Sequence, residues 1–157
     1  MAGSPFVIAY EGAFRLPRPP EEVWSVLQRL DCFESWWGWL TEFGVEGPGL
    51  QSGSVLRATV DPPLPYRIRV RLELVECLPP RCIEAAVHGD LEGRARLVLE
   101  DDGAGSRARV WSNIEVVQRP LRVAARLAPG LLGWGHDRVV EATVRSFRRH
   151  LVEDAPG

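Results

Sequence analysis

The stretch YRIRVRLELVEC, residues 66–77, alternates apolar and charged side chains at almost every second position. Alternation of this kind is typical of a β-strand whose two faces meet different surroundings, because successive side chains of a strand point to opposite sides. The apolar side chains predict a buried face, and the arginines between them predict a face in water. The apolar set comprises Tyr66, Ile68, Val70, Leu72 and Leu74.

Turn signals on both sides of this strand predict further strands antiparallel to it. SVLRATV (54–60) precedes it, and LPPR (78–81), GDLEG (89–93) and DDGAG (101–105) interrupt the chain after it. Short segments rich in proline, glycine and aspartate between such runs mark hairpins. We therefore expect consecutive antiparallel strands up to residue 118.

Beyond residue 118 the apolar residues recur with the period of a helix. Pro129 and Gly130 predict a break or kink, since proline cannot continue a helix without losing a hydrogen bond. After the break, one helix face carries apolar side chains at i, i+4, i+7 and i+11. These are Val140, Val144, Phe147 and Leu151. The chain is thus expected to end in its longest helix.

The segment before the strands predicts one strand and two short helices. FVIAYEGAFRL (6–16) predicts a strand that stops at PRPP, and Pro20 suits the first position of a helix. Asp31 and Glu34 have the spacing of a capping box, which predicts a second short helix beginning at Asp31. One face of that helix carries Phe33, Trp36, Trp37 and Leu40.

This order of elements, together with four local segments, resembles the START-like, or SRPBCC, helix-grip superfamily, in the branch of bacterial polyketide cyclase/dehydrase-like and lipid-transport-like proteins. The segments are PRPPEEVWSVLQRLDCFESWW, PPLPYRIRV, GDLEGRARLVLE and GWGHDRVVEATVRSFRRHL. The resemblance covers nearly the whole chain, and none of the four segments is a catalytic signature. It implies one α+β domain over residues 1–157, ordered from about residue 5 to about 152.

The implied helix-grip (START-like) fold is a curved antiparallel β-sheet wrapped around a long C-terminal α-helix, with two short helices after the first strand. The resemblance also implies a hydrophobic tunnel between sheet and helix, roofed in part by the second short helix. It does not imply one reaction, because members include carriers, sensors and cyclases.

Composition narrows the classes of partner and compartment. A net charge of −2 gives no positive field to gather phosphates, so we expect no nucleic-acid partner. The first residues lack a signal peptide pattern, and no segment is long and apolar enough to span a membrane, so a cytoplasmic location without stable membrane insertion is expected. A bacterial origin is expected from the use of arginine without lysine. A homodimer is compatible with the sequence.

The three cysteines are expected to be free thiols in a reducing compartment. Cys77 and Cys82 flank the LPPR turn and are placed to face each other across two strands, but two sulfurs without a histidine make a poor zinc site. We expect no metal and no cofactor.

The tryptophans of CFESWWGWL (32–40) have two interpretations. Trp36 and Trp37 at helical spacing are expected either to plug the core or to line the mouth of a cavity. A membrane-surface role would require basic residues on the polar face, where Glu34 and Ser35 stand instead. Trp111 has the parity of its polar neighbours Arg109 and Asn113, which predicts the wet face unless a β-bulge reverses the alternation and turns it toward the pocket.

Within the long helix, Gly133 and Gly135 flank Trp134 and precede His136. Helix glycines cost stability, so they predict either close packing on the sheet or room for a ligand. We interpret Ala85, Gly89 and Gly93 as small residues that leave space inside the sheet. The predicted ligand-binding residues are Trp36, Trp37, Leu40, Tyr66, Ile68, Val70, Ala85, Val87, Trp111, Trp134, His136 and Val140.

Two hypotheses of function follow. The first is a protein that binds a hydrophobic small molecule, lipid-like or polyketide-like, between sheet and long helix. The second is a polyketide cyclase-, aromatase- or dehydratase-like enzyme that uses the same cavity, for which His136 and Tyr66 are weak candidates as acid or base. The sequence also leaves open an interaction module for a protein partner.

Overall fold

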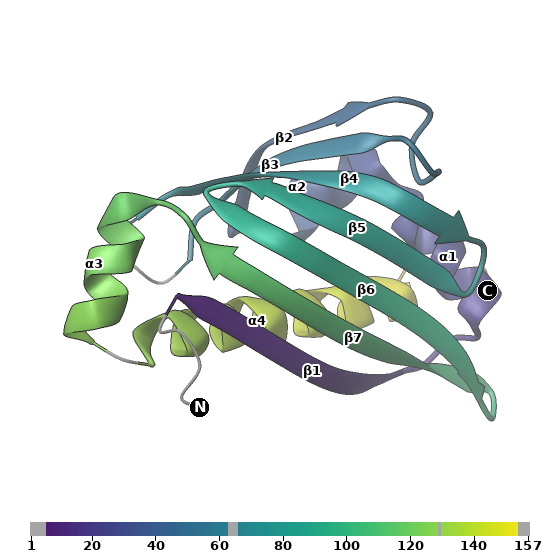
Figure 1. Cartoon of the computed structure of the whole chain (residues 1–157). Coiled ribbons are helices and arrows are strands. Elements are labelled where there is room, and N and C mark those ends of the chain that lie inside the picture. Colours follow the sequence, from purple (N-terminus) through teal and green to yellow (C-terminus); the bar gives the residue numbers. More distant parts are fainter. Residues whose placement is uncertain (1–5, 63–65, 129, 154–157) are drawn as a thin grey trace.

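The alternating and helical patterns become a seven-stranded sheet and a long helix in the computed structural model, which describes residues 6–62, 66–128 and 130–153. The elements follow the predicted order, strand, short helices, strands and C-terminal helix (Figure 1). In chain order they are β1 (Val7–Leu16), α1 (Pro20–Leu27), the 3-10 turn η1 (Leu30–Cys32), α2 (Phe33–Trp36), β2 (Leu40–Glu46), β3 (Val55–Val60), β4 (Ile68–Leu78), β5 (Cys82–Gly89), β6 (Leu91–Asp102), β7 (Gly105–Val116), α3 (Arg119–Leu127) and α4 (Leu131–Glu153).

All strand pairs are antiparallel, in the order β1-β7-β6-β5-β4-β3-β2. Strands β2 to β7 pair with their neighbours in sequence, as hairpins do. The segment α1-η1-α2 carries the chain from β1 at one edge to β2 at the other. The sheet curves around α4, and α3 lies at the opposite end of the sheet from α1 (Figure 1). This is the expected helix-grip architecture.

Strand β7 shows how the two faces of the sheet differ. Its even-numbered residues are mostly buried, including Ala108, Ser112 and Val116, and its odd-numbered residues are exposed. Because neighbouring strands pair in register, the same alternation runs across the sheet. The sheet therefore has an inner face toward α4 and an outer face in water.

Two hydrophobic clusters fill the two ends of the inner face. The larger cluster joins α1, α2 and the C-terminal half of α4 to the strands, and includes Trp24, Trp36, Trp37, Leu74, Leu99, Phe147 and Leu151. The smaller cluster lies near α3 and includes Ile68, Val116, Leu121, Ala125 and Leu132. The packed core is thus divided along the length of α4.

The second short helix is smaller than its apolar spacing predicts. Helix α2 is a single turn, Phe33–Trp36, and Leu40 instead begins strand β2. The predicted capping box is also wrong, because Glu34 Oε1 accepts a hydrogen bond from the backbone N–H of Phe43 at 2.5 Å. The carboxylate is used to hold β2 rather than to close a helix.

The cysteines are free thiols, as expected, over the described part of the chain. Cys77 and Cys82 are not directly opposite, since Cys77 pairs with Ile83 and Cys82 with Leu78. Directly opposed residues would share one face, whereas this register places the two side chains on different faces. Burial raises the pKa of the Cys77 thiol.

Candidate functional site

A row of mostly small side chains crosses the inner face from Tyr10 on β1 to Ala85 on β5, which belongs to the larger hydrophobic cluster. Tyr10, Ser112, Ala95 and Ala85 form one row across β1, β7, β6 and β5, each directly paired with the next. Ala95 and Tyr10 are only half-buried although they face α4. Neither cluster includes Ala95, Val87 or the half-buried Val140 of α4. The surroundings of Ala95 and Tyr10 are therefore less completely packed than the two clusters.

Gly12 makes room for the phenol of Tyr10 on strand β1. A Cβ atom on Gly12 would lie 2.8 Å from Cζ of Tyr10 and closer still to its hydroxyl oxygen. The Tyr10 ring therefore lies along its own strand, over the missing side chain of Gly12. A residue larger than glycine would displace the ring from this position.

His136 of α4 faces the Tyr10 ring. The two ring centroids are 5.0 Å apart with planes tilted by 53°. The Nδ1 atom of His136 is buried and has no hydrogen-bond partner among the described residues, and Oδ1 of Asp137 lies 3.7 Å away, beyond hydrogen-bond distance. Burial lowers the pKa of His136, and the nearby Asp137 carboxylate opposes that shift only in part. The imidazole is accordingly neutral at pH 7.

A second unpaired polar atom lies on β7, at Ser112, which pairs with Tyr10 of β1. The Ser112 hydroxyl is buried and makes no hydrogen bond within the described residues, and its residue is 7% exposed. Burial, followed by the charges of Asp137 and Glu141, raises the pKa of the Tyr10 phenol, which stays protonated. A neutral imidazole, a hydroxyl and a phenol can together donate and accept hydrogen bonds without carrying charge.

We call Tyr10, Ser112 and His136 the polar group. The edge where β1 meets α4 is hollowed on both sides of it. One hollow of about 270 Å³ adjoins Ile8 and Leu132, and another of about 550 Å³ adjoins Phe14 and Val144. Tyr10 and His136 lie between these positions along their own elements. The polar group is therefore close to an incompletely closed seam of the molecule.

Half of the predicted ligand-binding residues face the interior from the sheet or lie on α4 near it: Ile68, Val70, Ala85, Val87, His136 and Val140. Of these, Ala85 belongs to the larger packed cluster and Ile68 to the smaller one, and four other predicted residues also lie in or against these clusters. Trp36, Trp37 and Leu40 are 5–8% exposed and belong to the larger cluster, and Tyr66 packs against the smaller one. The structure thus uses the predicted aromatic helix as core packing at one end of the grip.

The candidate acid or base residues His136 and Tyr66 form no ring contact with each other within the described residues. Among the described residues the aromatic neighbour of His136 is Tyr10. The reason is the order of the strands. β1 lies against α4, whereas Tyr66 precedes β4, which is four strands away from β1 in the sheet. Neither Tyr10 nor Ser112 was among the residues predicted from sequence. Alternation along residues 6–16, which puts Tyr10 on the face of Ile8 and Phe14, is the signal that points to Tyr10.

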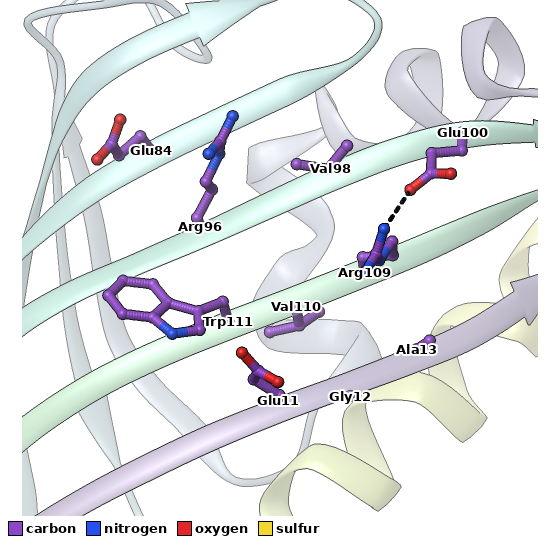
Figure 2. A pocket seen from close by; sticks show the side chains of 10 residues that line it. All are labelled: Glu11, Gly12, Ala13, Glu84, Arg96, Val98, Glu100, Arg109, Val110 and Trp111. Carbon is purple, nitrogen blue, oxygen red and sulfur yellow. Dashed lines mark hydrogen bonds and ion pairs between the residues drawn. The ribbon is translucent and has the colours of Figure 1, made fainter.

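Trp111 lies on the outer face, as its parity predicts, and so outside the interior site. It is 40% exposed and borders a hollow of about 710 Å³ over β1, β5, β6 and β7. Figure 2 shows its ring between Glu11 and Arg96, and an ion pair of 3.3 Å between Arg109 and Glu100 crosses the same surface. This hollow is lined by charged groups and differs from an enclosed apolar cavity.

Trp134 is also placed away from the interior, with 46% of its surface exposed and the Arg138 guanidinium 5.5 Å from its ring centroid. The glycines interpreted as space-makers have different roles. A Cβ atom on Gly89 or Gly93 would collide with the backbone of the neighbouring strand, and both have positive φ angles, 116° and 153°. They permit close strand pairing. Gly133, in contrast, has open space where a Cβ would be.

The described residues form neither a metal-binding cluster nor a helix that could span a membrane. No group of three or more histidine, cysteine or acidic residues there could hold a metal ion. None of the helices in that same portion of the chain has the length and hydropathy needed to cross a bilayer.

Known structures share this fold over nearly the full chain. The protein TTHA0849 from Thermus thermophilus superimposes with a TM-score of 0.76 at 14% identity, covering 95% of this chain and 100% of that one. The Zhui aromatase/cyclase from Streptomyces sp. R1128 gives 0.73 at 14% identity, with 96% and 97% covered. Ara h 8.0201 gives 0.71 at 14%, with 94% and 99% covered. At such identities the likeness concerns the fold alone.

Sequence comparison assigns the family. No functionally curated protein matches the chain significantly. Residues 8–152, nearly the whole chain, match the sequence profile described as polyketide cyclase / dehydrase and lipid transport. The chain therefore belongs to the polyketide cyclase / dehydrase and lipid transport family, within the START-like (SRPBCC) superfamily.

Proposed function

We propose that this protein binds a hydrophobic small molecule, lipid-like or polyketide-like, between the inner face of the sheet and α4. The observation that carries the proposal is that Ala95 and Tyr10 face α4 from the inner face of the sheet and are only half-buried, with Ala95 in neither hydrophobic cluster. A solid core would bury these side chains completely. The family assignment agrees with a role in binding such molecules.

The polar group supplies the orientation of the ligand in this proposal. Val70, Val87 and Val140 provide apolar walls, and Ser112 and His136 each present one unpaired buried polar atom. An unpaired buried group costs free energy, and a ligand oxygen that pairs with it recovers that cost. A ligand with one hydroxyl or carbonyl group in an otherwise apolar body fits this arrangement.

The first experiment asks whether anything is bound and where. Native mass spectrometry of the purified protein, followed by denaturing extraction, is expected to reveal a stoichiometric apolar adduct. Uptake of the neutral fluorophore N-phenyl-1-naphthylamine is then titrated in wild type and in Ala95→Leu, which fills the inner face. The matched control is Ala86→Leu, whose side chain lies on the outer face.

Ala95→Leu is expected to weaken uptake of the fluorophore at least tenfold, and Ala86→Leu to leave it unchanged. Circular dichroism of both variants checks that they fold. Equal uptake by the three proteins would contradict binding at this site. Absence of both an adduct and fluorophore uptake would contradict the proposal as a whole.

A second candidate function, a polyketide cyclase-, aromatase- or dehydratase-like enzyme, is favoured by one observation, the contact of neutral His136 with Tyr10. A neutral imidazole can remove a proton from a carbon between two carbonyls, and a phenol can donate a proton to the oxygen formed in an aldol step. The test is conversion of a poly-β-keto mimic by wild type and His136→Ala. Equal rates would remove His136 from the mechanism.

A further inference from the structure

Helix α3 has three distinct faces. Its buried face packs on the smaller cluster through Leu121, Ala124 and Ala125. An exposed apolar stripe follows, in which Val123 is 55% and Leu127 80% exposed. The remaining surface carries three arginines, Arg119, Arg122 and Arg126, and the helix contains no acidic residue. Large apolar side chains at this exposure lie next to a local positive charge on a chain whose net charge is −2.

The arginines surround a small hollow with an aromatic wall. The hollow has a volume of about 220 Å³ and is lined by Phe6, Arg119, Arg122, Val123 and Arg126. The guanidinium carbons of Arg122 and Arg126 lie 4.3 and 5.4 Å from the Phe6 ring centroid. No carboxylate lines this hollow. Its chemistry suits an anionic group attached to an apolar body.

The arginines differ in how firmly they are held. Arg122 donates to the backbone oxygen of Val116 at 3.0 Å and lies 3.4 Å from Oε1 of Glu115. Within the described residues, neither Arg119 nor Arg126 forms an ion pair with a carboxylate. One arginine is therefore fixed in place, and the two others keep their charge available to an outside anion.

We propose that α3 is a docking surface for an anionic lipid bilayer, with Val123 and Leu127 in the interfacial region and the three arginines near the lipid phosphates. An interfacial helix combines an apolar stripe with flanking basic residues, and α3 has both. The tryptophan segment 32–40 lacks the basic residues, and its rings are mostly buried. This proposal is independent of whether the interior binds a ligand.

The test measures co-sedimentation of the full chain with vesicles of phosphatidylcholine alone and of equal parts phosphatidylcholine and phosphatidylglycerol. Binding is expected only to the anionic vesicles and is expected to fall with added salt. Each basic residue near such a surface contributes about fivefold to partitioning, so the double variant Arg119→Gln/Arg126→Gln is expected to bind about 25-fold more weakly. The matched control is Arg145→Gln/Arg149→Gln, which removes two exposed arginines of α4.

Further arms separate the lipid surface from other anions and from unspecific charge effects. Leu127→Ser is expected to weaken vesicle binding without lowering the melting temperature, since its side chain is almost free of the core. Inorganic phosphate at constant ionic strength is expected not to displace the protein. Equal loss in the control double variant, displacement by phosphate, or no binding to anionic vesicles would each overturn the proposal.

Discussion

At the scale of single residues, the centre of the site depends on what is missing as much as on what is present. Gly12 lacks the Cβ that would displace Tyr10, and Ser112 and His136 each have one buried polar atom without a partner in the described part of the chain. Unpaired buried groups destabilise a fold unless something else satisfies them. Ser112 and His136 lie beside Tyr10, which is only half-buried, and this position links them to a ligand in our proposal.

His136 is expected to make folding stability depend on pH. Burial lowers its folded pKa below the unfolded value near 6.5, so the unfolded chain takes up a proton first as the pH falls. Stability is therefore lost from about pH 6.5 down to the folded pKa, and no further below it. The neighbouring Tyr10 phenol, whose pKa is raised by burial, stays protonated over this range.

The measurement is urea unfolding of wild type and His136→Gln at pH 7.5 and pH 5.5. The variant is expected to lose less free energy of unfolding than wild type on acidification. His88→Gln, at a histidine whose side chain is 41% exposed, serves as the control and should follow wild type. The same acid-dependent loss in all three proteins would contradict a buried neutral His136.

At the scale of elements, α2 is fixed to α4 by two hydrogen bonds that involve backbone oxygens. Trp37 Nε1 donates to the carbonyl of Thr143 at 3.2 Å, and the Ser146 hydroxyl donates to the carbonyl of Trp36 at 2.5 Å. A single turn of helix has little stability of its own. These bonds and the buried rings of Trp36 and Trp37 hold it as the closed end of the grip.

Ser146→Ala is expected to lower the free energy of unfolding by about 1 kcal/mol, since it leaves a partly buried carbonyl unpaired. Urea unfolding monitored by tryptophan fluorescence measures the change. Ser35→Ala removes a similar bond to the Cys32 carbonyl on an exposed segment, and its effect should stay within about 0.5 kcal/mol. A smaller loss for Ser146→Ala than for Ser35→Ala would show that this bond does not hold α2 on α4.

At the scale of the whole molecule, two hydrophobic clusters hold the sheet to α4 at its ends and leave the middle less completely packed. A ligand seated there would join the two clusters into one continuous core. Such a ligand binds the folded chain and not the unfolded one, so it must raise the melting temperature.

Saturation with N-phenyl-1-naphthylamine at about 100 times its dissociation constant is expected to stabilise the fold by about 2.7 kcal/mol. For a chain of this size that corresponds to a rise in melting temperature of roughly 5–10 °C. Differential scanning calorimetry follows the transition, because it does not depend on light absorption and the naphthyl ring absorbs strongly in the far ultraviolet. Ala95→Leu at the same concentration should show no rise, and an equal rise in that variant would locate the fluorophore elsewhere.

The sequence by itself determined the features that depend on local pattern. Alternation and turn residues predicted the central strands, and the parity of Trp111 placed it on the outer face. Two successive helices were also predicted, and α3 ends at Leu127 and α4 begins at Leu131, while Pro129 itself lies outside the described residues. Each of these follows from side-chain direction within one element, and that direction repeats with a fixed period. The order of these elements, together with the local segments that resemble the superfamily, predicted the helix-grip fold.

The tertiary structure alone decided which elements meet and how long the irregular ones are. Tyr10 rather than Tyr66 contacts His136, because β1 is the strand beside α4. Helix α2 ends at Trp36, before the helical spacing of apolar residues ends at Leu40, because Leu40 pairs with Val60 of β3 and so belongs to the sheet. Contacts between residues more than 100 positions apart leave no periodic trace in a sequence, since they depend on strand order and register.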